Sequence, residues 1–297
     1  MSGLRVCLFG RFAITCGDAS LSPDATKARE LLAYLLLHRD QAHYREKLAT
    51  LLWADSDPSR SKGYLRQALW QLQSALGEHC DLLAVDSDWI RINPEANLRL
   101  DVACFEQAAT ATRGIQGTDL TEESATALEE ASALYCADLL EHWFHDWCVF
   151  ERERLHNIHL AILEKLMSYF QVHGHYEEGI AYAMRLLRCE PAHERTYRFL
   201  MRLHALGSNR TAALRAYERC TAALAEGLGV EPSLRTASLY EQIREGHFPA
   251  GALASTTPDE TVSGILTHLE QLEQTLVDAQ HQVTREIDAL RRALLEP

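Results

Sequence analysis

The sequence predicts a mainly α-helical protein in three parts: a small α+β domain, an all-α array of helix pairs and one long C-terminal helix. Three observations predict this class. Short β-type runs lie within the first hundred residues, helical periodicity dominates after residue 101, and apolar residues recur every seven positions after residue 258. The expected boundaries are 1–98, 99–245, a linker over 246–258 and a heptad helix over 259–297.

Composition limits where a nucleic-acid-binding surface can lie. Of the 297 residues, 47% are apolar and 24% are charged, which allows a sizeable core and excludes overall disorder. The net charge is −13, but residues 1–100 contain 12 basic and 12 acidic residues, so the excess acid lies after residue 100. A surface that binds nucleic acid must therefore be local.

Cysteine usage and hydropathy indicate the cellular compartment in which the protein is expected. The 8 cysteines form no CxxC pair, which disfavours a zinc ribbon and fits a reducing cytoplasm without disulfides. The longest apolar run, 31–37, has seven residues, whereas a membrane span needs about 20. Because the N-terminus also lacks a signal-peptide stretch, we expect a soluble cytoplasmic protein that makes no use of a membrane.

The first hundred residues alternate strand and helix signals. Two strands are expected at 4–9 and 12–15 around Gly10, with a third near 19–21. Helices are expected over 27–38 and 45–53, where apolar residues follow i, i+3, i+4 spacing.

A third helix, expected over about 59–76 with Asp57 or Ser59 as its cap, has two unlike faces. One stripe consists of Leu65, Leu69, Leu72 and Leu76. The opposite side contains Arg60, Gly63, Gln67, Trp70, Gln71 and Ser74, with Lys62 and Arg66 on its flank. Arginine and glutamine bond base edges and phosphates, and this helix contains no carboxylate that would repel DNA.

A hairpin over 82–85 and 89–92, around Asp86-Ser87-Asp88, completes the domain. Strands, three helices and a terminal hairpin predict a winged helix-turn-helix of the α+β, OmpR-like type. In that fold the third helix enters the major groove and the second crosses the DNA backbone. The alternative is that the third helix is simply amphipathic and solvated.

Seven residues are expected to contact DNA: Tyr44, Arg45, Arg60, Lys62, Arg66, Gln67 and Gln71. Arg66, Gln67 and Gln71 are expected to contact bases, because Arg and Gln bond guanine and adenine edges bidentately. Tyr44 and Arg45 open the second helix and are expected to hold phosphate at its N-terminus.

Seven further helices are expected, over about 101–113, 122–135, 146–173, 176–189, 192–206, 210–226 and 232–244. Asp101 is expected to cap the first of them. Residue types coincide at an offset of 34, as Leu166 with Leu200 and Met167 with Met201 illustrate. This period predicts a tetratricopeptide-like array of helix pairs.

The C-terminal segment has a heptad pattern at Val262, Leu269, Leu276, Val283 and Leu290. Four to five heptads with a nearly continuous seam predict a coiled coil. Because a solitary helix would expose this stripe, it needs a partner. A homodimer through residues 259–297 is the simplest option, and docking on another protein or on the repeats are the alternatives.

Several blocks, in this order, resemble one family: LRVCLFG at 4–10, KARELLAYL at 27–35, LATLLW at 48–53, LRQALWQL at 65–72, LDV at 100–102, ALRAYERC at 213–220 and LGVEP at 228–232. Over about residues 3–245 the chain resembles bacterial transcriptional activators of the antibiotic-regulatory-protein type, whose second region is the bacterial transcriptional activator domain.

The resemblance implies sequence-specific binding to double-stranded promoter DNA at direct repeats, and activation by contacting RNA polymerase. It also implies that the loop 54–58 faces the polymerase. The repeats would receive a signal or partner, such as an unidentified peptide or small-molecule effector. The acidic hairpin tip departs from the family's neutral or basic tip, so we expect little contribution from the wing to DNA binding.

Catalysis has no support in the sequence, which lacks a phosphate-binding P-loop and a nucleophile motif. Two histidine-containing groups could form a metal site: His142, His145, Asp146 and Cys148, and His156 with His159. A role as ordinary packing or surface residues on helices, among Trp143, Phe144 and Trp147, explains them better, so we expect no enzyme, no cofactor and no metal. The remaining alternative is a helical-repeat adaptor whose winged helix binds protein instead of DNA.

Overall fold

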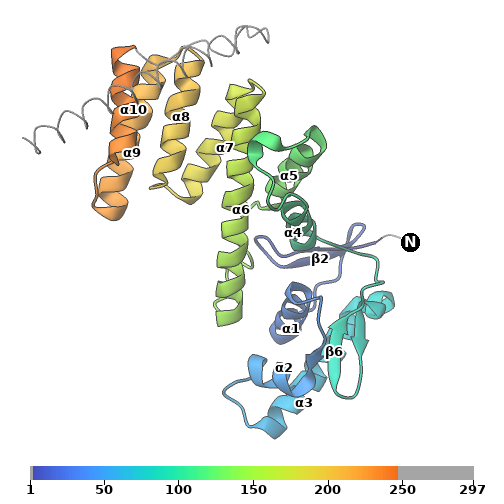
Figure 1. The fold of residues 1–297 in the computed structure, drawn as a ribbon. Helices are drawn as coiled ribbons and strands as arrows, with labels where there is room; N and C mark the ends of the chain where they lie inside the picture. Colours follow the sequence, from blue (N-terminus) through green and yellow to red (C-terminus); the bar gives the residue numbers. More distant parts are fainter. Residues whose placement is uncertain (1–2, 247–297) are drawn as a thin grey trace, which may run out of the picture. The chain divides into compact units, whose positions relative to one another are not determined.

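The computed structural model describes residues 3–246, shown in Figure 1. The expected heptad helix at 259–297, with its coiled coil and homodimer, lies outside the described residues, as does the linker after Gly246. The chain divides into two compact units after Thr196. The first unit contains all strands of the described residues and α1 to α7.

Two small sheets organise the N-terminal hundred residues. The four-stranded sheet has the order β3-β2-β1-β7, with β1 antiparallel to β2 and parallel to β7. The three-stranded sheet has the order β4-β6-β5 and contains the expected hairpin. The bounds are β1 Leu4–Cys7, β2 Ala13–Cys16, β3 Ala19–Ser20, β4 His43–Tyr44, β5 Leu83–Val85, β6 Trp89–Ile92 and β7 Leu98–Leu100.

Three helices pack together between these strands: α1 (Thr26–Leu37), α2 (Arg45–Leu52) and α3 (Pro58–Leu76). The Asp57 carboxylate accepts the Ser59 amide at 3.1 Å and Pro58 occupies the first turn, so α3 begins where its cap was expected. It ends at Gly77, whose φ is +54°. Its leucine stripe is buried as predicted.

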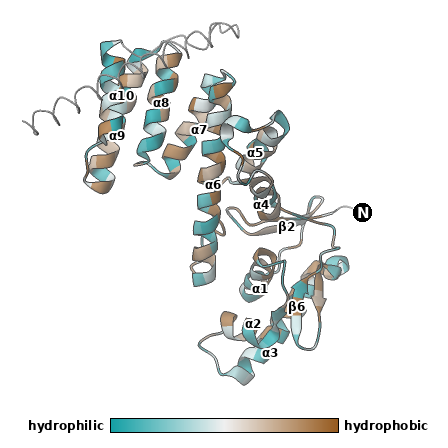
Figure 2. Cartoon of the chain, viewed as in Figure 1, coloured by the Kyte–Doolittle hydropathy of each residue, from teal (hydrophilic) through white to brown (hydrophobic). Residues whose placement is uncertain are grey.

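Four helices continue the first unit: α4 (Asp101–Ala111), α5 (Glu122–Leu134), α6 (Asp146–Val172) and α7 (Tyr176–Cys189), with the short turn η2 (Gly117–Asp119) between α4 and α5. One apolar core extends from β1 and α1 into α4, α5 and α6. Phe9 shows this continuity, because its ring lies 5.2 Å from that of Phe105 and 4.9 Å from that of Tyr135. Figure 2 shows hydrophobic and hydrophilic residues alternating along the helices, as expected when one face is buried.

Asp101 has a different role from the expected cap. It is the first helical residue of α4, and Leu100 precedes it at the cap position. Its carboxylate accepts the amides of Leu8 at 2.8 Å and Phe9 at 2.9 Å, as well as that of Val102 at 2.7 Å. Asp101 therefore joins α4 to the end of β1. Burial raises the pKa of this carboxyl, although the three amide donors oppose that shift.

The second unit contains α8 from Tyr197 on, α9 and α10, with bounds α8 Glu194–Leu206, α9 Arg210–Leu228 and α10 Leu234–Glu245. Arg198 of α8 donates to Thr236 of α10 at 2.9 Å, and the rings of Tyr217 and Tyr240 stack at 4.2 Å. Helix ends repeat after 34 residues: α6 and α8 end at Val172 and Leu206, and α7 and α9 begin at Tyr176 and Arg210. The sequence period thus recurs in the helix boundaries.

Each α-helix of the described residues begins and ends within two residues of its expected position. Strands β4 and β7 were not expected, because runs of two or three residues are too short for an alternation pattern and depend on distant partners. In the part of the chain that the structure describes, no helix is long and apolar enough to cross a membrane.

Candidate nucleic-acid interface

The outward face of α3 is the candidate interface. Arg60, Arg66 and Gln67 are exposed along it, and Gln71 is half-buried. Trp70 lies between them on the helix surface and is 67% exposed. The periodicity of the leucines already placed Trp70 on this face, but the expected contact residues did not include it. An exposed indole in the middle of a polar face can pack on thymine methyl groups or sugars.

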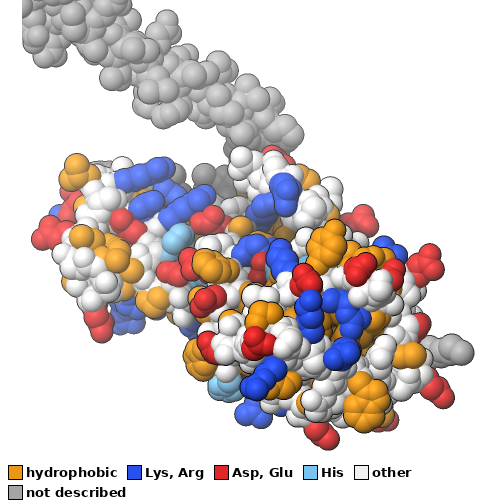
Figure 3. Space-filling model, turned by 90° about the horizontal axis from the view of Figure 1, so that it is seen from below, with side chains coloured by type: hydrophobic (Ala, Val, Ile, Leu, Met, Phe, Trp, Pro, Cys, Tyr) orange, Lys and Arg blue, Asp and Glu red, His pale blue; other side chains and the backbone are white. Residues whose placement is uncertain are grey.

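Figure 3 views the molecule from below, the side on which α2 and α3 lie in Figure 1. Lys and Arg side chains lie close together on this side, with acidic side chains beside them. An acidic residue of α2 pairs with a lysine of α3: Glu46 Oε1 accepts Lys62 Nζ at 2.6 Å, and both side chains are exposed. The hydrogen bond from Lys62 lowers the pKa of Glu46.

The Lys62–Glu46 pair changes what α3 offers to a ligand. The helix itself has no carboxylate, as its sequence shows, but its neighbour supplies one. Exposed ion pairs contribute little to stability. A phosphate can therefore replace Glu46 as the partner of Lys62 at small cost.

The start of α2 is held by the hairpin. Tyr44 is the last residue of β4, at the cap position of α2, and is 69% exposed. The Arg45 amide donates to the carbonyl of Asp88 at 2.9 Å, and its guanidinium donates to the carbonyl of Asp86 at 3.1 Å. The hairpin tip thus positions Arg45, a contact that the sequence interpretation missed. The guanidinium has further N–H groups that this bond does not use.

The remaining expected surface is the loop 54–58. Its residues are exposed apart from Ser56, which is half-buried, and it contains Asp55 and Asp57. Ser61 of α3 anchors the loop, because its hydroxyl lies within hydrogen-bond distance of the carbonyls of Trp53, Ser56 and Asp57. The loop is therefore a short, acidic and ordered projection next to the start of α3.

Comparison with known proteins identifies the region after β7. Residues 100–244 match the family model described as the bacterial transcriptional activator domain. The chain contains a bacterial transcriptional activator domain. The domain begins at Leu100, where β7 ends, and reaches the last turn of α10. The family resemblance on the sequence blocks is therefore confirmed.

Curated relatives extend the match to the N-terminal part. The chain is 24% identical over 240 residues to the regulatory protein AfsR of Streptomyces griseus, covering 81% of this chain but 24% of AfsR. It is 26% identical over 246 residues to the transcriptional regulatory protein MoaR1 of Mycobacterium tuberculosis, covering 80% of this chain and 78% of MoaR1. The chain thus spans about a quarter of AfsR and most of MoaR1.

A solved structure has the same fold. The structure of Mycobacterium tuberculosis EmbR in complex with a low-affinity phosphopeptide superposes with a TM-score of 0.66. The sequences are 22% identical, and the match covers 91% of this chain and 72% of that one.

Charged side chains connect α1 and the segment after it to the activator domain. Arg39, after α1, donates to Glu106 of α4 at 2.6 Å, and Glu106 also accepts Arg154 of α6 at 2.5 Å. Glu30 of α1 is buried and pairs with Lys27 at 2.7 Å and with His145 at 3.3 Å. These contacts define the orientation of α1 relative to α4 and α6.

The members of the two histidine-containing groups have separate surroundings: His142 and Asp146 are exposed, and His156 pairs with Glu190 at 3.2 Å. His145 stacks on Trp147 besides pairing with Glu30, and Cys148 is buried near Arg152. His159 is buried and stacks on Tyr135 at 4.2 Å, and burial lowers its pKa to about 4. Among the residues that the structure describes, no group of three or more His, Cys, Asp or Glu is placed to hold a metal ion.

Proposed function

We propose that the chain is a sequence-specific DNA-binding transcription regulator. Residues 1–98 form a winged helix-turn-helix that inserts α3 into the major groove. Residues 99–245 form a tetratricopeptide-like activator domain that receives a signal or partner. The observation that supports this proposal most is the outward face of α3, which is basic and amide-rich, is largely exposed in the described part of the chain and has no carboxylate of its own.

The role proposed for each residue follows from its position on the outward face of α3 or at the start of α2. Arg66, Gln67 and Gln71 contact base edges, because their planar groups match the hydrogen-bonding edges of guanine and adenine. Arg60 and Lys62 contact phosphates at the edges of the groove. Tyr44 and Arg45 contact phosphate at the start of α2, where the helix dipole also favours an anion.

Gly63 supports a close approach of DNA to α3. It lies inside the helix, where glycine costs about 0.5–1 kcal/mol relative to alanine. Among the described residues, and apart from the backbone of the helix itself, no atom lies within 4 Å of the place where a Cβ would be, so packing there does not require glycine. Contact with a DNA strand explains this residue, because a Cβ would then meet the strand.

Activation by recruiting RNA polymerase is proposed through the loop 54–58. The loop is exposed and ordered by Ser61, and the family resemblance assigns it this role. The relatives AfsR and MoaR1 are named as regulatory proteins, which supports transcription regulation as the function. A homodimer through 259–297 would raise affinity by making the second DNA contact intramolecular.

One observation favours the second candidate, an adaptor that binds protein. Phe144 and Phe150, near the start of α6, are 82% and 75% exposed. Exposed aromatic side chains on a folded surface are typical of protein-binding sites. An adaptor would use this surface, whereas a DNA-binding regulator requires α3.

Selection of genomic DNA fragments with purified protein tests the proposal. We expect enrichment of a defined sequence in direct repeats, and salt-sensitive binding in which log K falls by about 0.9 per neutralised phosphate for each unit of log salt. Equal recovery of all fragments would contradict sequence-specific recognition and favour the adaptor.

A further inference from the structure

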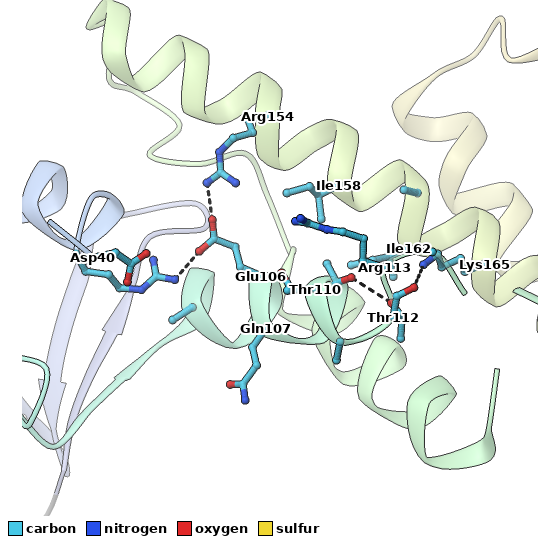
Figure 4. A pocket seen from close by; sticks show the side chains of 16 residues that line it. Asp40, Glu106, Gln107, Thr110, Thr112, Arg113, Arg154, Ile158, Ile162 and Lys165 are labelled. Carbon is cyan, nitrogen blue, oxygen red and sulfur yellow. Dashed lines mark hydrogen bonds and ion pairs between the residues drawn. The ribbon is translucent and has the colours of Figure 1, made fainter. Parts of the chain in front are cut away.

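A large cavity lies where the activator domain meets the segment that follows α1. It has a volume of about 940 Å³ and is lined by α4, the turn after α4, α6 and the residues Arg39 and Asp40. Figure 4 shows side chains from these elements around the space between α4 and α6. Ligand sites in proteins have volumes of about 300–1,000 Å³, so this cavity is large enough for a small organic molecule.

The charged lining is predominantly basic. It consists of four cations and two carboxylates: Arg39, Arg113, Arg154, Lys165, Asp40 and Glu106. Glu106 is shared by Arg39 and Arg154, while the Arg113 guanidinium makes no hydrogen bond or ion pair with any described residue. The lining therefore has an excess of positive charge, although residues 101–297 are strongly acidic. An anion would be attracted to this cavity and repelled by most of the surrounding surface.

Lys165 adds a further donor to the lining of the cavity. Its ammonium group donates to the Thr112 carbonyl at 2.5 Å, and burial lowers its pKa. An anionic group beside Lys165 would stabilise the charged form of the side chain. The ammonium group has further N–H donors available for such a ligand.

The wall between the charged groups is apolar. Ala103 of α4 and Ile158, Ala161 and Ile162 of α6 line this part. The turn after α4 is held tightly against α6, since a Cβ on Gly117 would lie 2.5 Å from the Lys165 carbonyl. The cavity thus combines a cationic lining with an apolar wall, which suits a molecule with an anionic group and an apolar body.

We propose that this cavity binds a small organic anion with an apolar body and that its occupancy alters DNA binding. The anionic group is held by Arg113 and Lys165, and it competes with Glu106 for Arg39 and Arg154. Arg39 follows α1, which packs on α3, and it precedes β4 and α2 by a few residues. The second half of the proposal rests on the proposed DNA-binding function, whereas the first half does not.

The binding test uses full-length protein and two matched dyes, 8-anilinonaphthalene-1-sulfonate and its uncharged analogue N-phenyl-1-naphthylamine. We expect the sulfonate to bind with enhanced fluorescence at one site per chain. The double variant R113Q/K165M should weaken the binding affinity for the sulfonate dye by about tenfold or more, because two charge-assisted contacts are lost. The affinity for the neutral dye should stay nearly unchanged. The exposed Arg188 of α7 lies outside the cavity, so R188Q is the matched control and should bind as the wild type does.

A third variant tests the location. Ala161→Trp places an indole in the cavity and should weaken the binding of both dyes. The double variant should weaken the binding of the anionic dye alone. Unchanged sulfonate affinity in R113Q/K165M, or unchanged binding of both dyes in Ala161→Trp, would overturn the proposed site. Circular dichroism and thermal unfolding show whether each variant is folded.

The coupling has its own readout. Fluorescence anisotropy on the selected DNA fragment, with and without saturating sulfonate dye, should show a shift in DNA affinity for the wild type and R188Q but not for R113Q/K165M. Dye binding without any shift in DNA affinity would overturn the coupling between the cavity and DNA binding, while the proposed binding site would stand. Absence of DNA binding in dye-free protein would instead overturn the proposed function.

Discussion

Helices α1 and α3 pack against each other but differ in how their residues are used. Nine of the 12 residues of α1 are buried, including the charged Glu30, which has two partners. Only six of the 19 residues of α3 are buried, and they form one stripe. Packing thus accounts for nearly every residue of α1, whereas the arginine, glutamine, glycine and tryptophan of the outward face of α3 need another explanation. The proposed binding to DNA supplies one.

The largest expected effect is on the stability of α1. Leu35→Ala removes a fully buried side chain and should lower the free energy of unfolding by about 2–5 kcal/mol. Gln67→Ala on the outward face of α3 should change it by no more than about 0.5 kcal/mol. Urea unfolding of both variants measures this contrast, and equal losses would mean that the face of α3 is also structural.

The next largest effect is the pH dependence of stability that arises from the buried His159. The folded-state pKa of His159 is lowered to about 4, so as pH falls below its ordinary value of 6.5 the unfolded state takes up the proton first. Stability should therefore fall between pH 6.5 and 4, by an amount on the order of 3 kcal/mol for this group. His159→Phe should flatten that part of the profile of unfolding free energy against pH. An unchanged slope would show that His159 is not its source.

Base contacts should affect binding without affecting the fold. Arg66→Ala or Gln67→Ala should each cost about 1–3 kcal/mol of binding free energy and relax the preference at one base pair. Competition anisotropy against single-base operator variants measures this loss. Uniform weakening on every sequence would reassign the residue to a phosphate contact.

The smallest effects should have opposite signs. Gly63→Ala should stabilise the fold by about 0.5–1 kcal/mol, because alanine is the better helix former. It should also weaken DNA binding, because its methyl group meets the DNA strand. Thermal unfolding and anisotropy on the same sample test both, and Ser74→Ala on the same face is the control. A variant that is more stable and binds DNA equally well would remove the close-approach argument.

Periodicity predicted much of α3 but not its surroundings. Spacing of the leucines gave the buried stripe, and Asp57 with Pro58 gave the start of the helix. The Lys62–Glu46 pair joins residues 16 apart, and the bond from Arg45 to the hairpin joins residues 41 apart. Local patterns cannot show such contacts, because the neighbouring element decides which charge meets which.

The cavity could not be predicted from the sequence for the same reason. Its basic residues come from the segment after α1, from the turn after α4, and from α6. In the sequence, each of these residues is indistinguishable from an ordinary surface charge. His145 and Cys148 show the converse, because their closeness in sequence suggests a metal site while their neighbours in the fold make them packing residues.

Protection of guanine N7 from dimethyl sulfate tests the central claim most directly, because this atom lies in the major groove. The measurement uses the selected fragment with the wild type, Arg66→Ala and the control Arg188→Gln. The account predicts protected guanines with the wild type and the control, and loss of protection at one guanine with Arg66→Ala. Bound protein that leaves every guanine N7 reactive, or a pattern that Arg66→Ala does not change, would contradict the insertion of α3 into the groove.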